Sequence, residues 1–289
     1  MKTRVFAVYA VIFLFCGIVN AGINDGLVAY YPFNGNANDE SGNGNNAKVY
    51  GATLTSDRSG NSGSAYLLSG NSGYYGSGIR IEIPCMIQSL TNMSVSLWAR
   101  IDSFSVASEA IIWFGNSSGA IGIIASADQP QKLIIYDNNT QSWLATGKGA
   151  YAPTSDFIGY FRHYVMVIDG VNGIVRGYYD GTKVAEYSVA PGKVNVGGDT
   201  SCAIGKHWWG NNSEQSSDRI NGVFDDVRIY NRTLSDSEVQ KLYQGQSSCS
   251  DDIVVKPYTF TAGTPAKASE INANFDAIFQ RINTPRCTN

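Results

Sequence analysis

The sequence contains little charge and almost no histidine, and both shortages exclude classes of function. Charged residues make up 16% of the chain, the formal net charge is -3, and no cluster of Lys and Arg occurs along it. Nucleic acids and anionic membrane surfaces attract concentrated positive charge, so both are poor candidate partners. With only two histidines, the chain is also a poor candidate for a zinc site or a hydrolase triad.

Long apolar runs are absent too, except for one at the N-terminus. Residues 5–19 are apolar, follow Lys2 and Arg4, and precede the small residue Ala21. The run is about fifteen residues long, short of the ~20 that a membrane-spanning helix needs, and its organisation is that of a secretory signal peptide. We therefore expect residues 1–21 to be removed. The remaining protein should be secreted, or held in the cell envelope, without membrane insertion.

Removal of this peptide would leave four of the five cysteines, an even number in an oxidising compartment. Such cysteines usually form disulfides. Three pairings are possible. Cys249 and Cys287 bracket the C-terminal tail, whereas Cys85 and Cys202 lie in the main body. We therefore favour Cys85 with Cys202 and Cys249 with Cys287.

A long helical pattern is also missing from the main body. About a dozen short apolar or alternating segments recur instead, such as "SVSLWARI" and "HYVMVIDG", separated by turn residues. This pattern predicts an all-β, two-sheet antiparallel sandwich. The clearest hairpin is expected over residues 174–189, where Asp180-Gly181 supplies a turn that needs left-handed backbone angles.

One short helix is predicted after the last strand-like segment. Ser235 and Glu238 have the spacing of a capping box, and Leu234 can pack on Val239 as a hydrophobic staple. This helix should close a domain of residues 22–245. Residues 246–256 are small and polar and indicate a linker.

The remaining residues, 257–289, predict a short helical tail. Apolar residues repeat there at heptad-like spacing, at Ile271, Phe275, Ile278 and Ile282. Fewer than three heptads form a marginal helix in isolation. The tail should therefore dock on the sandwich, associate with copies of itself, or be held by the second disulfide.

Three passages of the main body resemble a known family. They are "LVAYYPFNGNANDESGNGNNAKVYGA", then "SVSLWARI" with "RHYVMVIDG" and "VRGYYDGTKVAEY", and finally "NGVFDDVRIYNRTLSDSEVQKLY". Together they resemble the laminin G-like, or concanavalin A-like, jelly-roll family of bacterial secreted proteins over residues 22–245. The resemblance implies two antiparallel sheets of six or seven strands with the first and last strands adjacent. The tail segment "FTAGTPAKASEINANFDA" is similar to segments of bacterial envelope and fibre-like proteins.

The resemblance also implies a structural calcium ion. In related jelly-roll glucanases and lectin-like domains, the strand that matches "FDDVRIY" lends an aspartate to calcium near the loop after the first strand. Asp225 fits this position, and Asp39 is the best carboxylate of the oxygen-rich loop 34–46. The alternative is that Asp225 faces solvent or pairs with an arginine such as Arg228, while Asp39 caps the turn before Ser41. Asp226 should pair or face water.

Catalysis is not expected. A retaining glucanase of this architecture needs two carboxylates about 5 Å apart on one strand. Glu82, Glu109 and Glu186 are each isolated in different segments. His163, in "RHYVMVIDG", should be a structural histidine packed beneath neighbouring strands.

Carbohydrate binding is the function that the sequence favours. Sugars stack their apolar faces on aromatic rings, and polar residues accompany several aromatics in apparent loops. The candidate ligand-binding residues are Tyr75, Trp143, His207, Trp208 and Trp209. If Trp208 and Trp209 belong to a strand, only one of the two can point outward. The partner would be an extracellular glycan or a surface protein. The alternatives are an adhesion or scaffold role without glycan binding and, third, a glycan-active hydrolase.

Overall fold

The computed structural model describes residues 22–69, 79–86, 90–104, 108–116, 119–126, 129–137, 142–145, 157–189, 191–192, 202–206 and 220–245. For residues 129–137 and 142–145 it describes the backbone. The predicted signal peptide, linker, helical tail and Cys249–Cys287 pair lie outside these residues. Within them, no helix is both long enough and apolar enough to span a bilayer.

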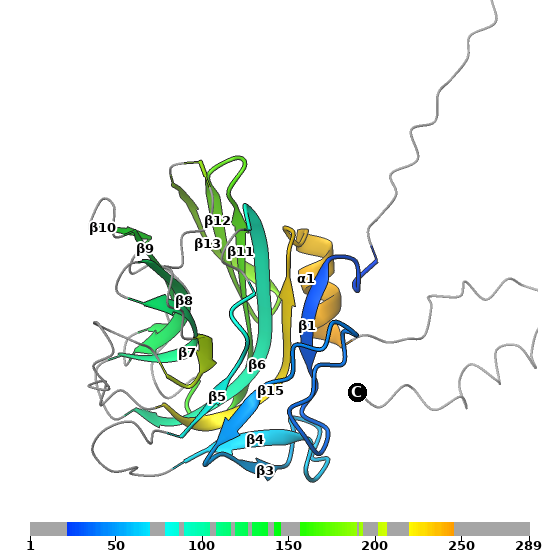
Figure 1. Ribbon diagram of the computed structural model, residues 1–289. Coiled ribbons are helices and arrows are strands. Elements are labelled where there is room, and N and C mark those ends of the chain that lie inside the picture. Colours follow the sequence, from blue (N-terminus) through cyan, green and yellow to red (C-terminus); the bar gives the residue numbers. More distant parts are fainter. Residues whose placement is uncertain are drawn as a thin grey trace, which may run out of the picture.

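Two antiparallel sheets face each other and form the predicted sandwich (Figure 1). The first is eight-stranded and runs in the order β13 (Thr182–Ser188), β12 (Ile174–Tyr179), β11 (Phe161–Asp169), β6 (Asn92–Phe104), β15 (Ile220–Tyr230), β4 (Ala65–Leu68) and β3 (Thr53–Thr55), with β1 (Leu27–Tyr31) also paired to β15. The second is seven-stranded and runs in the order β10 (Ser142–Ala145), β9 (Gln129–Asp137), β8 (Gly119–Ser126), β7 (Ser108–Asn116), β14 (Cys202–Ile204), β5 (Arg80–Glu82) and β2 (Lys48–Tyr50).

The first and last strands are neighbours, as expected. Tyr31 of β1 lies opposite Val227 of β15. The eight-stranded sheet has one strand more than the six or seven expected, because two short strands share one edge of β15. The first part of β15 pairs with β4, where Gly222 lies opposite Leu68, and its last part pairs with β1.

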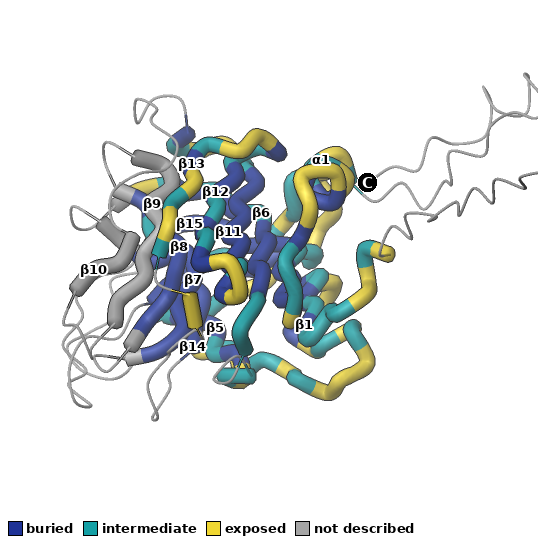
Figure 2. Tube along the Cα trace, turned by 90° about the horizontal axis from the view of Figure 1, so that it is seen from above, coloured by how far each residue is buried: buried dark blue, intermediate teal, exposed yellow. Residues whose placement is uncertain are grey.

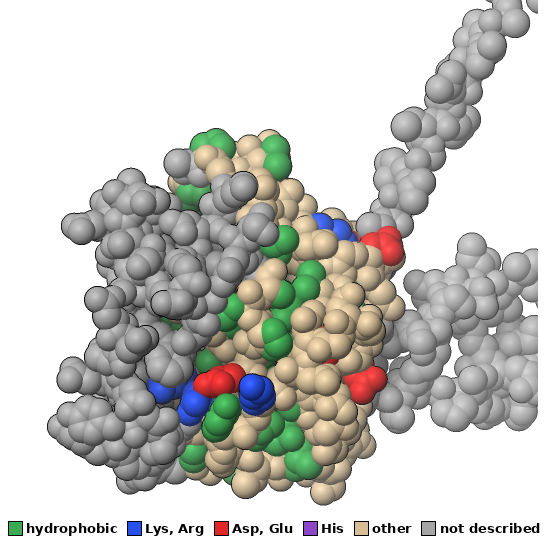
Figure 3. Space-filling view, viewed as in Figure 1, with side chains coloured by type: hydrophobic (Ala, Val, Ile, Leu, Met, Phe, Trp, Pro, Cys, Tyr) green, Lys and Arg blue, Asp and Glu red, His purple; other side chains and the backbone are tan. Residues whose placement is uncertain are grey.

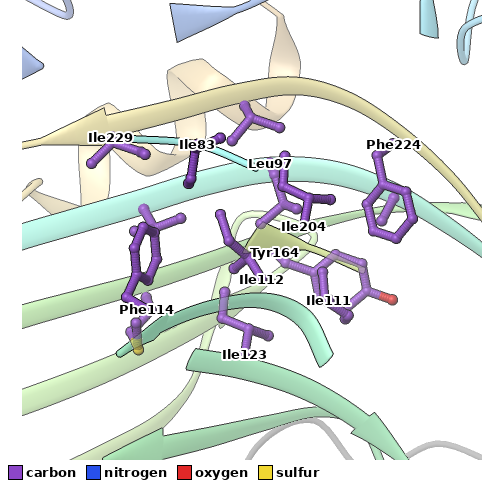
Figure 4. Packing of buried hydrophobic residues seen from close by; sticks show 14 of the residues in the cluster. Ile83, Leu97, Ile111, Ile112, Phe114, Ile123, Tyr164, Ile204, Phe224 and Ile229 are labelled. Atoms are coloured by element: carbon purple, nitrogen blue, oxygen red, sulfur yellow. The ribbon is translucent and has the colours of Figure 1, made fainter. Parts of the chain in front are cut away.

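Strand alternation builds the core between the sheets. In β6 the side chains of Val95, Leu97 and Ala99 are fully buried in the main apolar cluster, while Ser96 and Trp98 point to the other face of the sheet. Figure 4 shows ten labelled core residues from both sheets, directed toward one another. Burial is concentrated in these central strands, and exposed residues gather in the connections (Figure 2).

The disulfide predicted within the main body is present. Cys202 of β14 is bonded to Cys85, which follows β5, across a separation of 117 residues. The two strands are hydrogen-bonded neighbours, and Ile83 N donates to the Cys202 carbonyl oxygen at 2.9 Å. The covalent bond therefore reinforces a short β-ladder of the seven-stranded sheet.

Helix α1 (Asp236–Gln244) begins at the predicted capping box. Ser235 is its N-cap, and its hydroxyl accepts from Glu238 N while the Glu238 carboxylate accepts from Ser235 N. Leu234 and Val239 are buried in one cluster on the outer face of the eight-stranded sheet. The staple and the box thus fix the helix against this face, beside β1 and β15 (Figure 1).

The predicted hairpin joins β12 and β13 and also touches the helix. Asp180 and Gly181 have φ values of 48° and 74°, the left-handed angles that this turn requires. Gln240 Nε2 donates to the Gly181 carbonyl oxygen at 2.7 Å. A Cβ at Gly181 would lie 2.9 Å from Tyr243 Cδ1. Glycine is therefore required both by the turn and by the helix packed on it.

Candidate functional site

Most of the predicted ligand-binding aromatics cannot be placed. Tyr75, His207, Trp208 and Trp209 lie outside the described residues. The backbone of Trp143 lies in β10, the edge strand of the seven-stranded sheet, opposite Tyr136 of β9. Whether these side chains form one site stays a prediction.

The described ends of two aromatic-bearing segments do lie together. Segment 70–78 connects β4 to β5, and segment 207–219 connects β14 to β15. Leu68 of β4 pairs with Gly222 of β15, and a Cβ added at Gly205, just after β14, would collide with the Leu68 side chain. Both segments are therefore anchored at neighbouring points of the sandwich.

Asp39 serves as the acceptor that organises the first loop. Its Oδ1 accepts from the backbone N–H groups of Tyr30 and Ser41, and its Oδ2 accepts from the Ser41 hydroxyl and Asn45 N–H, all at 2.9 Å. Burial alone would raise the pKa of Asp39, but these hydrogen bonds hold it below its usual value. Asp39 thus caps the turn before Ser41, which is the alternative to metal ligation.

The paired aspartates of "FDDVRIY" lie at a β-bulge. The register of β15 against β6 shifts between Asp225 and Arg228, and Asp226 has a left-handed φ of 49°. Aspartate tolerates this conformation better than most residues do. The bulge falls where the outer edge of β15 changes its partner from β4 to β1. The local geometry explains why a strand interior contains two adjacent aspartates.

A single arginine, Arg58, contacts both carboxylates. Arg58 Nη1 lies 2.7 Å from Asp225 Oδ2 and 2.6 Å from Asp226 Oδ2. Asp226 Oδ1 also accepts from the Tyr30 hydroxyl at 2.8 Å and lies 3.5 Å from Arg228 Nη2. We define Tyr30, Arg58, Asp225, Asp226 and Arg228 as the bulge cluster. Asp225 therefore pairs with Arg58, and Arg228 forms an ion pair with Asp226.

Burial and nearby charges shift the pKa values of the two carboxylates of the bulge cluster in opposite directions. Burial, reinforced by the negative charge of Asp226, raises the pKa of Asp225 well above its usual range, and Arg58 offsets this only in part. Burial acts in the same direction on Asp226, but Arg228, Arg58 and the Tyr30 hydrogen bond together lower the pKa of that carboxyl. Asp226 is therefore the more strongly anionic member of the pair.

Arg58 was not among the residues predicted from the sequence, although the turn that carries it has a recognisable sequence pattern. Asp57 Oδ1 accepts from Ser59 N–H and Asn61 N–H at 2.8 Å, so "DRSGN" is an aspartate-capped turn. The Arg58 guanidinium also lies 4.7 Å from the Trp98 ring centroid. The partner of the aspartates comes from a turn 167 positions earlier in the chain, a distance that local patterns do not cover.

These contacts bear on the calcium hypothesis. Calcium needs six to eight oxygen ligands with free lone pairs, whereas Asp39 faces four hydrogen-bond donors and Asp225 faces a guanidinium. Among the described residues, no three His, Cys, Asp or Glu side chains lie close enough to hold a metal ion together. In this arrangement Asp39 and Asp225 do not fit a shared calcium ion. Calcium binding itself stays a prediction.

His163 is buried on the outer face of the eight-stranded sheet, in agreement with the structural role predicted for it. Its Nε2 lies 2.8 Å from Ser96 Oγ, and its ring centroid lies 5.2 Å from that of Trp98. Burial, together with the positive charges of Arg228 and Arg58, lowers the pKa of His163 to about 3. The ring is therefore neutral over the physiological range.

Two of the three isolated glutamates have nearby cationic partners, and the side chain of Glu109 lies outside the part of the chain that the structure describes. Glu82 lies 2.6 Å from Arg80 in the seven-stranded sheet, and Glu186 lies 3.0 Å from Arg176 in the eight-stranded sheet. On the face shown in Figure 3, described charged side chains are sparse, and acidic and basic groups lie side by side. The described part of this face thus presents no extended field of one sign.

Comparison with known families agrees with this geometry. A family model described as the concanavalin A-like lectin/glucanases superfamily matches residues 69–240, more than half of the chain. The chain belongs to this superfamily. Members share the two-sheet sandwich, so family membership accounts for the fold, while activity depends on the individual site. No curated protein sequence matches the chain.

This chain is also similar to several solved structures with the same two-sheet architecture. Domain 4 of AbnA, a GH43 extracellular arabinanase from Geobacillus stearothermophilus, in complex with arabinotriose, is 25% identical with a TM-score of 0.53; the alignment covers 75% of this chain and 98% of that domain. The binding domain of Paraclostridial Mosquitocidal Protein 1 is 18% identical with a TM-score of 0.58, over 77% of this chain and 52% of that one.

A third structure has the same fold at low identity. The ligand binding domain of botulinum neurotoxin serotype D, in complex with N-acetylneuraminic acid, is 17% identical with a TM-score of 0.57, over 77% of this chain and 52% of that one. The chain thus spans about half the length of these two toxin domains, and the likeness to them shows the fold alone.

Proposed function

We propose that the chain is a secreted carbohydrate-binding module without catalytic activity. The observation that carries this proposal is the likeness to domain 4 of the arabinanase, which is matched over 98% of its length and was solved with an oligosaccharide. The match covers a whole domain, so the comparison concerns an independent unit. Family membership supports carbohydrate recognition, because the description of the superfamily names lectins and glucanases.

The binding residues belong to the proposal as well. We assign sugar contact to Trp208 and Trp209, with His207, Tyr75 and Trp143 as further contacts. Indole and phenol rings offer flat apolar surfaces for the faces of sugar rings, and hydroxyl-rich neighbours satisfy the sugar's polar groups. The neighbouring anchor points of segments 70–78 and 207–219 support the grouping of Tyr75 with residues 207–209, whereas Trp143 lies in β10, four strands from β14 in the seven-stranded sheet.

A glycan array followed by titration calorimetry tests the proposal. The mature protein should bind at least one glycan saturably, and Trp208→Ala should weaken that binding about tenfold or more, the effect of losing ~1.4 kcal/mol of contact. Tyr160→Ala is the matched control, because Tyr160 is an aromatic residue that is 59% exposed and lies outside the proposed contacts. Binding that survives all five aromatic and histidine substitutions would refute this site, and a blank array would refute glycan recognition.

An adhesion or scaffold role is the second candidate, favoured by the apolar stripe predicted for residues 257–289. If the tail drives self-association, Ile278→Asp should convert an oligomer to a monomer in light scattering. Equal masses for the two proteins would exclude association through this stripe.

A further inference from the structure

The bulge cluster contains two largely buried carboxylates, which need positive charge nearby to be stable. The side chain of Asp225 is 4% exposed and that of Asp226 is 15% exposed. A carboxylate held away from water without a counter-charge is strongly unfavourable. Family members that bind calcium at such a strand would use the metal for this purpose. Here a side-chain nitrogen of Arg58 lies within 2.7 Å of both carboxylates.

The turn that carries Arg58 is built to hold it in place. Asp57 accepts from the backbone N–H groups of Ser59 and Asn61 and from Asn61 Nδ2. Asp57 N and Gly60 N form two further backbone bonds within the turn. The turn leaves the guanidinium between the carboxylates and the Trp98 ring, 4.7 Å from the ring centroid. A planar cation suits both neighbours.

Within the bulge cluster the formal charges balance without a metal, and the nearby carboxylate of Asp57 also acts on Asp225. Two carboxylates, of Asp225 and Asp226, face two guanidinium groups, of Arg58 and Arg228. Arg228 in turn lies 4.0 Å from the Tyr30 ring centroid, and Tyr30 donates to Asp226. A divalent ion placed between the carboxylates would add two positive charges beside two fixed cations. It could enter only if Arg58 left.

We propose that Arg58 is an internal cation that takes the place of a divalent metal at the β15 bulge. It joins the β3–β4 turn to β15 and, because Trp98 stacks on Tyr243 with ring centroids 5.7 Å apart, to helix α1. The sandwich is therefore independent of calcium at this point. Removal of Arg58 leaves a cation position that a small external cation can fill.

Thermal unfolding of the mature protein in chelator and in millimolar calcium tests this inference, with four variants beside the wild type. Arg58→Ala removes the internal cation. Arg58→Ala combined with Asp225→Asn also removes the carboxylate with the raised pKa. Arg176→Ala is the matched control, because Arg176 forms an ion pair with the more exposed Glu186. Arg58→Lys retains the charge if the alanine variant does not fold.

The wild type should melt within about 1 °C in chelator and in calcium. In chelator, Arg58→Ala should lower Tm by about 10 °C, the shift expected from leaving a buried carboxylate unpaired in a domain of this size. Calcium or methylguanidinium should restore several degrees by mass action. Adding Asp225→Asn should restore stability in chelator and abolish the response to calcium. Arg176→Ala should change Tm by less than about 2 °C.

Three results would overturn the inference. One is a wild-type Tm that rises by several degrees with calcium together with saturable calcium binding in calorimetry. Another is an Arg58→Ala variant no less stable than Arg176→Ala. The third is an Arg58→Ala variant that neither calcium nor methylguanidinium stabilises. If the alanine variant does not fold, the inference is tested by the wild-type Tm in chelator and in calcium and by the Arg58→Lys variant. Lysine should retain more than half of the stabilisation that Arg58 provides, because it keeps the positive charge.

Discussion

His163 should account for a distinct part of the destabilisation of the sandwich by acid. Its folded-state pKa of about 3 lies far below the ordinary value of 6.5. As the pH is lowered, the histidine is protonated in the unfolded chain at a higher pH than in the folded protein, so acid favours the unfolded chain. Its contribution to stability is therefore complete above about pH 6.5, falls as the pH is lowered, and is gone near pH 3.

The size of the effect follows from the two pKa values. Each unit between them corresponds to 1.36 kcal/mol, so lowering the pH from 7.5 to 4.5 should remove about 2.7 kcal/mol of unfolding free energy through His163 alone. His163→Gln retains a polar group that can reach Ser96 Oγ but cannot titrate. The variant should therefore lack this part of the acid sensitivity, whatever its stability at neutral pH.

Urea unfolding at several pH values measures the difference. The stability of the wild type relative to His163→Gln should fall by about 2.7 kcal/mol over that range, and contributions from other titrating groups, including Asp225, cancel in the comparison. His207→Gln is the matched comparison, because it removes the other histidine of the chain and leaves His163 in place. Parallel curves for the wild type and His163→Gln would show that the ring is not held neutral by burial.

Two further substitutions test the packing. Replacing Cys85 and Cys202 together by serine should lower the unfolding free energy by about 4.7 kcal/mol, because the unfolded chain then gains the entropy that a cross-link closing a loop of about a hundred residues removes. The two cysteines are 117 positions apart here. A reducing agent that leaves the wild-type urea midpoint unchanged would contradict this. Gly181→Ala should be more destabilising than Gly42→Ala, since both have left-handed φ but only Gly181 meets Tyr243; equal losses of about 1–2 kcal/mol would show that the backbone strain alone decides.

Much of the fold could be predicted because its determinants are local. The alternation of β6, the Asp180-Gly181 turn and the capping box of Ser235 and Glu238 each lie within a few residues of one another. The family resemblance supplied what local patterns cannot, the pairing of β1 with β15. The sharing of one β15 edge by two short strands was not predicted, because edge pairing depends on where the tertiary fold ends each strand.

The bulge cluster could not be derived in the same way. A one-residue shift in a ladder decides whether Asp226 faces the core or a neighbouring turn. The sequence shows two aspartates that require compensation, but not which of several cations provides it. The family resemblance implied calcium, and the alternative was an arginine such as Arg228, whereas the structure places Arg58 within 2.7 Å of both carboxylates.

The most direct test of the proposed function is titration calorimetry of the mature protein with arabinotriose and with the strongest ligand found on a glycan array, for the wild type and Trp208→Ala. A saturable isotherm for at least one of these sugars, reduced about tenfold or more in affinity by the substitution, is the predicted result. Flat isotherms with every sugar, from a protein whose cooperative unfolding shows that it is folded, would contradict carbohydrate recognition by this domain.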